Sequence, residues 1–275
     1  MSATVFLGGG RITGALAAGL RLAGDRRRIV VYDRHPEKLR ALRRESGVEI
    51  ARDLKSAVER AEMLVIAVRP ASVKRMLAEV MACGAFSRKA GPPRLCVSLA
   101  AGIPLKKLRA WLGEPRHRGS VRWARAMPSP VGRMGRGLTA GCFERGVTKA
   151  ERRQVHELFA RVGAVVEVPE SRMDAFTAAY SSSHGYHALA ALAKAGQDAG
   201  LDRETALTAA AHALSDGIAY WRASGQSLDE LLEEAATPGG IAAATMSAMD
   251  AAGYGRAVKK GIQAGVKRAR RNAML

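Results

Sequence analysis

The stretch ATVFLGGGRITGALAAGL, residues 3–20, decides how the first part of this 275-residue chain folds. Its apolar run ends in three glycines, as a buried strand does before a tight turn, and ITGALAAGLRLAG then has the pattern of a helix that stops at Gly24. Gly8 and Gly10 have the spacing that opens a G-x-G-x-x-G dinucleotide loop. Thr13 stands where the third glycine is expected, and its methyl group should move the helix outward unless Gly14 compensates.

A glycine loop between a strand and a helix can hold a pyrophosphate on the N-terminus of that helix. The next apolar run ends in VYDR, where Asp33 can bind the ribose hydroxyls of NAD and Arg34 can accommodate the additional phosphate of NADP. The residues leave the choice between NADP and NAD open. The alternative interpretation is an ordinary turn with a solvent-facing Asp–Arg pair.

Apolar runs and helical patterns alternate as far as residue 169, which predicts a parallel, doubly wound α/β sheet covered by helices on both faces. From residue 170 onward the chain is Ala-rich and helical, with glycines between the helices. We therefore expect two domains. They are a Rossmann-type dinucleotide-binding domain at 1–169 and an all-helical domain at 170–275 that completes its core by dimerising.

Composition argues against several classes of protein. The formal net charge is +19, but the basic residues are scattered, which favours a solvated basic surface over specific nucleic-acid binding. No run of about 18 apolar residues could span a bilayer, so no membrane partner is expected. The widely spaced Cys83, Cys96 and Cys142 indicate neither a disulfide framework nor a zinc site, and we expect a cytoplasmic protein.

Along nearly its whole length the chain resembles the pyrroline-5-carboxylate reductases, which reduce a cyclic imine to proline with NAD(P)H. The family's G-x-G-N-M-G/A-x-A loop is matched by LGGGRITGAL, and its A-V-K-P-Q segment is matched by AVRPASV. Its V-S-I-A-A-G-V segment is matched by VSLAAGI. Its R-A-M-P-N-T-P-A-L-V-G-x-G-M-T-A segment is matched by RAMPSPVGRMGRGLTA. The resemblance implies a nucleotide-binding domain and a helical domain that interlocks in dimers. It also implies a cofactor site made of Gly8, Gly10, Arg11, Ile12, Asp33, Arg34, Ala67, Val68, Arg69, Pro70 and Ser129.

Two further segments imply where the substrate carboxylate binds. DAFTAAYSSSHGY lies on D-A-x-T-x-L-S-G-S-G-P-A-Y, and TPGG lies on the T/S-P-G-G that opens a helix in the family. The first segment keeps Ser182 and Tyr186 of the family's central pattern, while His184 departs from it. After TPGG, Ile241 stands where the family has a hydroxyl residue. The resemblance implies a substrate site made of Ser181, Ser182, Ser183, Thr237, Gly239 and Gly240, with Ser182 and His184 as catalytic candidates. Capping of a helix is the alternative role of the serines.

His184 could donate a proton near neutral pH or contact a larger substrate, and a histidine bonded to backbone at a helix start is the other interpretation. His184, His187 and His212 lack an accompanying carboxylate or cysteine, so we expect no metal.

The sequence thus predicts an NAD(P)H-dependent reductase of pyrroline-5-carboxylate or a related imino acid, with NADP or NAD as cofactor. It is expected to form a homodimer through its helical domain, and a higher oligomer stays open. The alternative is a non-catalytic paralogue that binds the nucleotide as a sensor or partner protein, because Thr13, Ser129 and Ile241 depart from the family pattern.

Overall fold

The computed structural model describes residues 3–84, 86, 94–113 and 119–275. The chain divides into two compact units. The sheet unit comprises Met1–Ala179 and Gly265–Leu275, and the helical unit comprises Tyr180–Ala264. This grouping differs from a division at residue 170 because α8 (Met173–Ala179) and the end of α13 (Tyr254–Asn272) pack with the sheet.

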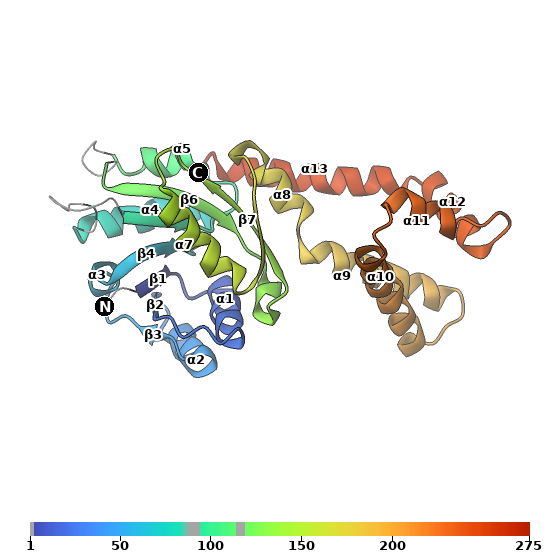
Figure 1. The fold of residues 1–275 in the computed structure, drawn as a ribbon, viewed down its shortest axis with the longest axis horizontal. Coiled ribbons are helices and arrows are strands. Elements are labelled where there is room, and N and C mark those ends of the chain that lie inside the picture. Colours follow the sequence, from blue (N-terminus) through green and yellow to red (C-terminus); the bar gives the residue numbers. More distant parts are fainter. Residues whose placement is uncertain (1–2, 85, 87–93, 114–118) are drawn as a thin grey trace. The chain divides into compact units, whose positions relative to one another are not determined.

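The sheet unit contains one eight-stranded sheet in the order β3-β2-β1-β4-β5-β6-β7-β8 (Figure 1). Its strands are β1 (Ala3–Leu7), β2 (Ile29–Tyr32), β3 (Glu49–Ile50), β4 (Ala61–Ile66), β5 (Arg94–Ser98), β6 (Val121–Met127), β7 (Gly137–Phe143) and β8 (Gly163–Glu167). Neighbouring strands from β3 to β6 pair parallel, and the chain order reverses between β1 and β4. This reversal is the switch point at which doubly wound sheets bind ligands, and it confirms the predicted Rossmann-type fold.

The strand β7 departs from the expected parallel arrangement. It pairs antiparallel with β6, and β8 then pairs parallel with β7. Residues 128–136, which include the 3-10 turn η1 (Pro130–Met134), connect β6 to β7. That link is too short for a parallel crossover, which needs a dozen or more residues, so the strand must turn back.

Helices cover both faces of the sheet, and the strands alternate their side chains between two cores. In β1, Phe6 belongs to one core, while Val5 and Leu7 belong to the other. The core around Phe6 is covered by α1 (Arg11–Leu22), α2 (Pro36–Ser46) and α7 (Lys149–Ala160). The other core is covered by α3 (Leu54–Glu59), α4 (Pro70–Ala82), α5 (Leu105–Ala110) and α8.

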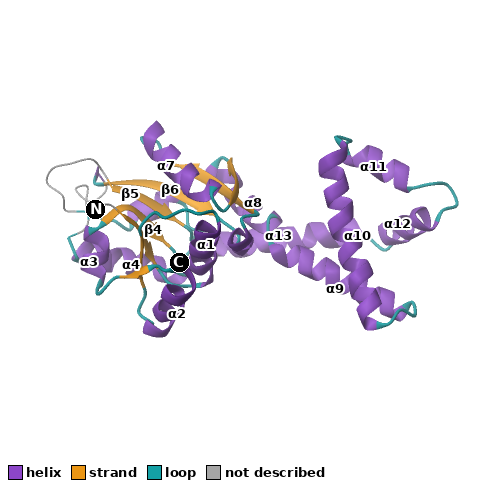
Figure 2. Ribbon diagram, turned by 60° about the horizontal axis from the view of Figure 1, so that its bottom comes forward, coloured by secondary structure: helices purple, strands orange, loops and turns teal. Residues whose placement is uncertain are grey.

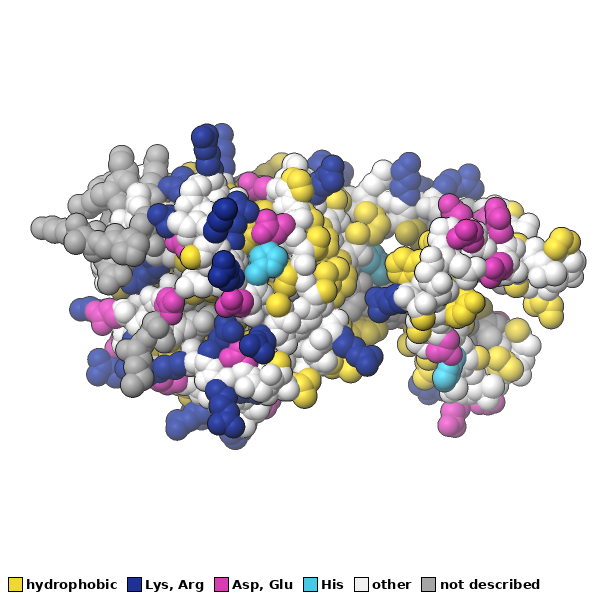
Figure 3. Space-filling model, in the orientation of Figure 1, with side chains coloured by type: hydrophobic (Ala, Val, Ile, Leu, Met, Phe, Trp, Pro, Cys, Tyr) yellow, Lys and Arg dark blue, Asp and Glu magenta, His cyan; other side chains and the backbone are white. Residues whose placement is uncertain are grey.

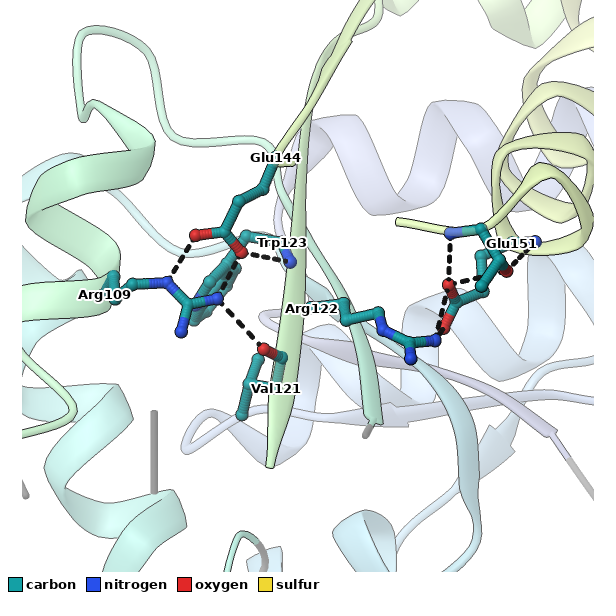
Figure 4. Close-up of polar contacts among 7 residues, drawn as sticks. Arg109, Val121, Arg122, Trp123, Glu144 and Glu151 are labelled. Atoms are coloured by element: carbon teal, nitrogen blue, oxygen red, sulfur yellow. Dashed lines mark hydrogen bonds and ion pairs between the residues drawn. The ribbon is translucent and has the colours of Figure 1, made fainter. Parts of the chain in front are cut away.

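Two ion pairs join the helices α5 and α7 to the strands β6 and β7 (Figure 4). The Arg109 guanidinium on α5 donates to both carboxylate oxygens of Glu144 and, at 3.2 Å, to the Val121 carbonyl. Arg122 on β6 donates at 2.9 Å to Glu151, in the first turn of α7. Because such hydrogen-bonded ion pairs are directional, they fix the orientation of α5 and α7 on the sheet in addition to the apolar packing.

The helical unit contains α9 (Ser182–Asp198), α10 (Arg203–Ser224), α11 (Leu228–Ala235), α12 (Ile241–Ala251) and the first part of α13 (Figure 2). The buried side chains recorded in it are the small Ala193, Ala206 and Ala210. Large apolar side chains are exposed instead. They include Tyr186, Ile218, Tyr220, Trp221, Leu228, Leu232 and Ile241. Figure 3 shows apolar side chains, in yellow, on the visible surface of this unit. None of the described helices is both long and apolar enough to cross a membrane.

Candidate active site

A cavity of about 820 Å³ lies in the sheet unit at the carboxyl ends of β1, β2, β4 and β5. This position is the crevice at the switch point, and the volume falls within the range of about 300–1,000 Å³ found for small-molecule sites. Most of the residues predicted to bind the cofactor line the cavity. They are Gly8, Gly10, Arg11, Ile12, Asp33, Arg34, Ala67, Val68 and Arg69.

The glycine loop forms the floor of the cavity. Gly8 has a φ of +118°, and a Cβ atom there would stand 2.7 Å from the Ala67 carbonyl oxygen, so the position requires glycine. At Gly10 a Cβ atom would meet nothing within 4 Å, which leaves the backbone open to a ligand. Gly10 is also the N-cap of α1 and supplies no side-chain acceptor. The first N–H groups of α1 can therefore bind an anion.

Thr13 closes the turn that precedes it. Its side chain is fully buried, and its hydroxyl donates a hydrogen bond of 2.6 Å to the Gly8 carbonyl. The need for a small residue falls on Gly14, where a Cβ atom would come within 3.1 Å of the Leu42 side chain. The departure from G-x-G-x-x-G is thus compatible with a well-formed loop.

Asp33 binds the glycine loop itself. Its Oδ2 accepts the Gly9 N–H at 2.7 Å, while its Oδ1 accepts the His35 N–H at 2.9 Å and contacts His35 Nδ1 at 2.7 Å. Burial disfavours the ionised carboxylate, but these hydrogen bonds and the charge of Lys38 outweigh it and hold the pKa of Asp33 below its usual range. An ionised carboxylate therefore holds the loop, and protein groups already contact both of its oxygens, Oδ1 twice and Oδ2 once.

Basic side chains surround this carboxylate. The Lys38 ammonium lies 3.4 Å from His35 Nδ1, and Arg34 lies exposed beside Asp33. The arrangement leaves an excess of positive charge around the cavity, which suits a ligand that carries several phosphates. The lysine and arginine residues that line the cavity are Arg11, Arg34, Lys38, Arg69 and Arg75.

Two predicted cofactor residues do not line the cavity. Pro70 is the first residue of α4, directly after the lining residue Arg69. Ser129 is buried and caps η1, where its hydroxyl accepts the Val131 N–H at 3.3 Å.

Sequence reasoning missed several lining residues, although a signal for them existed. They stand at the ends of parallel strands or in the first two turns of the helices that follow, which is where a doubly wound sheet gathers its ligand contacts. The missed residues are Tyr32, His35, Lys38, Ser72, Arg75, Met76 and Leu99.

The predicted substrate residues lie at two helix starts in the helical unit. Ser181 is the N-cap of α9, where its Oγ accepts the Ser183 N–H at 3.4 Å and lies 2.7 Å from Ser183 Oγ. Capping is therefore one role of this serine, and Ser182 begins the helix beside it. The carboxylate-binding role remains a prediction.

The second helix start follows Thr237. The Gly240 N–H donates to the Thr237 carbonyl at 2.8 Å, Gly239 has a φ of +76°, and no side chain caps α12. Ile241, the first residue of α12, is 89 % exposed. The start of α9 and the helix α12 lie apart from each other in both Figure 1 and Figure 2. One copy of the chain therefore does not bring these two segments together.

Within the described part of the chain, no group of three or more His, Cys, Asp or Glu side chains could hold a metal ion. His212, which the sequence grouped with His184 and His187, instead contacts Asp216 through Nδ1 at 2.8 Å.

Comparison with known proteins agrees with the sequence resemblance. A family profile for pyrroline-5-carboxylate reductase dimerisation matches residues 170–272, and one for NADP oxidoreductase, coenzyme F420-dependent, matches residues 4–102. The pyrroline-5-carboxylate reductase of Mycobacterium tuberculosis is 31% identical over 290 residues, which cover 98% of this chain and 96% of that protein.

Solved structures share the fold along the whole chain. Pyrroline carboxylate reductase from Plasmodium falciparum with NADP bound has a TM-score of 0.85 at 20% identity, covering 99% of this chain and 98% of that one. The enzyme of Coxiella burnetii named pyrroline-5-carboxylate reductase has a TM-score of 0.84 at 24% identity, with the same coverage of 99% and 98%.

Proposed function

This chain belongs to the pyrroline-5-carboxylate reductase family, and we propose that it reduces pyrroline-5-carboxylate, or a related cyclic imino acid, with NADPH. The observation that carries the proposal is the basic cavity built around the glycine loop, in a chain that resembles such a reductase over 98% of its length. When bound, the nicotinamide supplies a hydride to the imine carbon, and the imine nitrogen takes a proton. The relatives are named as reductases, which supports an enzyme over the non-catalytic alternative.

Asp33 and its neighbours support NADPH over NADH as the preferred cofactor. An acidic residue at this position selects NAD when its oxygens are free to bind the ribose hydroxyls. Here His35 contacts Oδ1 twice and Gly9 donates to Oδ2, so the carboxylate has too few open acceptor positions to bind both ribose hydroxyls, one on each oxygen. Arg34 and Lys38 line the same cavity and can bind a phosphate on the ribose.

The substrate carboxylate binds, in this proposal, at the helix starts around Ser181–Ser183 and Thr237–Gly240. A helix N-terminus offers free N–H groups and a positive dipole end, and the serines add hydroxyl donors. A cyclic iminium is already electrophilic, so the protein has chiefly to align it with the nicotinamide. We assign that alignment to Ser182 and a proton-donating role to His184.

Two copies of the chain form a homodimer through residues 170–272. The exposed apolar side chains of the helical unit and the dimerisation profile over residues 170–272 support this assembly. Such a dimer could supply α12 of one copy to α9 of the other. Basic side chains are scattered over the face seen in Figure 3 rather than gathered in one patch, which gives no support to specific nucleic-acid binding. We place the enzyme in the cytoplasm because of its cysteine pattern.

The test is a turnover assay that follows loss of nicotinamide absorbance. Pyrroline-5-carboxylate and the six-membered piperideine carboxylate are each offered with NADPH and with NADH. We expect turnover of the five-membered ring and a preference for NADPH. Turnover of the larger ring alone would assign His184 and Ile241 to a changed specificity. If nucleotide binds but neither imine is reduced, the proposed reaction is wrong.

A further inference from the structure

The turn Ala100–Pro104 lies between the cofactor cavity and the two ends of the segment 170–272, which the dimerisation profile matches. It follows Leu99, which lines the cavity next to the end of β5. Leu99 lies across the switch point from Asp33 because the strand order runs β2-β1-β4-β5. In a doubly wound sheet a dinucleotide spans that switch point, so Leu99 lies on the nicotinamide side when Asp33 marks the adenosine side.

The last turn of α13 holds this turn from one direction. Asn272 is 8% exposed and donates from Nδ2 to the Ala101 carbonyl at 3.0 Å. Arg268 donates to Asn272 Oδ1 at 2.6 Å, which fixes the orientation of the amide. Gly102 has a φ of +76°, and a Cβ atom there would stand 2.0 Å from the Ala269 carbonyl oxygen. The helix therefore lies directly on the backbone of the turn.

Glu170 holds the other end of the turn. Its Oε1 accepts the N–H of Leu105, the residue after Pro104, at 2.6 Å. The same oxygen accepts from Nη1 of Arg125 at 3.2 Å. Arg125 is only 2% exposed, and its Nε and Nη2 have no hydrogen-bond partner among the described residues. A second carboxylate, that of Asp174, lies 3.8 Å from Nη2. Because a buried cation needs carboxylates beside it, Arg125 helps to keep Glu170, which lies within hydrogen-bond distance, in place.

Glu170 and Asn272 are the first and last residues of the segment that the dimerisation profile matches. We propose that both are positioning residues for the nicotinamide half of the cofactor, acting through the turn Ala100–Pro104. With the Ala101 carbonyl and the Leu105 N–H both anchored, the turn cannot shift without breaking a hydrogen bond, and Leu99 stays in the cavity wall. The inference rests on the proposed function only in taking NADPH as the ligand.

The test compares a whole and a truncated nucleotide. Asn272→Asp keeps the shape of the side chain but puts an acceptor against the Ala101 carbonyl. Dissociation constants are measured for NADPH and for adenosine 2′,5′-bisphosphate, which lacks the nicotinamide. We expect the variant to weaken NADPH about fivefold, as the loss of one hydrogen bond does, and to leave the bisphosphate unchanged. Arg271→Ala, an exposed change on the same helix turn, is the matched control and should alter neither value.

A second variant approaches the contact from the other side. Gly102→Ala brings a Cβ atom against Ala269 and should also weaken NADPH more than the bisphosphate, with a lower melting temperature. Equal losses for both nucleotides in the two variants, or wild-type values for both, would overturn the proposal. Neither measurement uses an imine. Nucleotide binding without turnover would therefore refute the proposed reaction alone, and turnover with an unaffected Asn272→Asp variant would refute this inference alone.

Discussion

The nucleotide cavity and the predicted substrate segments are built in different ways. The cavity takes its residues from the ends of β1, β2, β4 and β5, whose positions one hydrogen-bonded sheet fixes. The substrate residues stand at the starts of two separate helices, α9 and α12, in a unit whose recorded buried residues are alanines. A site held by one sheet is complete within one chain. A substrate site at the starts of α9 and α12 depends on the protein surface that packs against those helices.

Polar contacts show the same difference. In the cavity, Asp33 and Thr13 are bound to the glycine loop by hydrogen bonds of 2.7 and 2.6 Å. At the start of α9, Ser181 contacts the neighbouring Ser183, and Ile241 at the start of α12 is largely exposed. We therefore expect changes in the cavity to act within one chain, and changes at the helix starts to act on substrate binding.

The largest effect is expected from Gly8→Ala. The new Cβ atom meets the Ala67 carbonyl at a positive φ, and strain of about 3 kcal/mol corresponds to a loss of nucleotide affinity of roughly 100-fold. Nucleotide titration measures the loss of affinity, and chemical denaturation measures the loss of stability that the strain causes. Gly10→Ala is the matched control. It should weaken nucleotide binding and cost at most about 1 kcal/mol of stability, because its Cβ atom points into open space. Equal destabilisation by the two changes would contradict the described loop.

Arg34→Ala tests the adenosine end of the cavity. Loss of a hydrogen bond from a charged group to the ribose phosphate costs about 1.5–3 kcal/mol, so the KM for NADPH should rise roughly 10- to 100-fold. The KM for NADH should change little. Arg40→Ala removes the same charge from an exposed position of α2 outside the cavity and serves as the control. A parallel rise of KM for both cofactors would exclude Arg34 as the phosphate ligand.

Ser182→Ala tests the helical side with a smaller effect. Loss of one neutral hydrogen bond to the substrate should raise the KM for the imine roughly three- to tenfold, with little change in the KM for NADPH. Ser181→Ala should in addition cost about 1 kcal/mol of stability, because Ser181 caps α9. Steady-state kinetics and denaturation of both variants separate the two roles. Unchanged imine kinetics in Ser182→Ala would remove that residue from the substrate site.

The smallest effect concerns the broken motif. Thr13→Gly restores the third glycine but removes the buried hydrogen bond to Gly8 and places glycine inside a helix, so the free energy of unfolding should fall by about 1–2 kcal/mol. Thr13→Ser keeps the hydroxyl and should lose less. Urea denaturation of the three proteins checks this order, and a more stable Thr13→Gly variant would show that the hydrogen bond contributes nothing.

The sequence was most informative where structure is local. The strand, glycine loop and helix around Gly8, and the helix that begins at Pro36, follow from patterns of neighbouring residues. The reversal of β7 was missed because apolar runs carry no sign of strand direction, although the short link after Met127 indicated it. The turn held by Asn272 was missed because its partners lie 171 residues apart. No periodicity reports such a contact.

The transfer of deuterium from NADPH labelled at the reactive nicotinamide carbon tests the central claim most directly. Pyrroline-5-carboxylate is converted with cofactor labelled on one face and then on the other, and the product is analysed by mass spectrometry and NMR. We predict that one of the two cofactors yields proline with a single deuterium on the former imine carbon. Nucleotide binding without labelled proline from either cofactor would contradict hydride transfer to a cyclic imine in this protein.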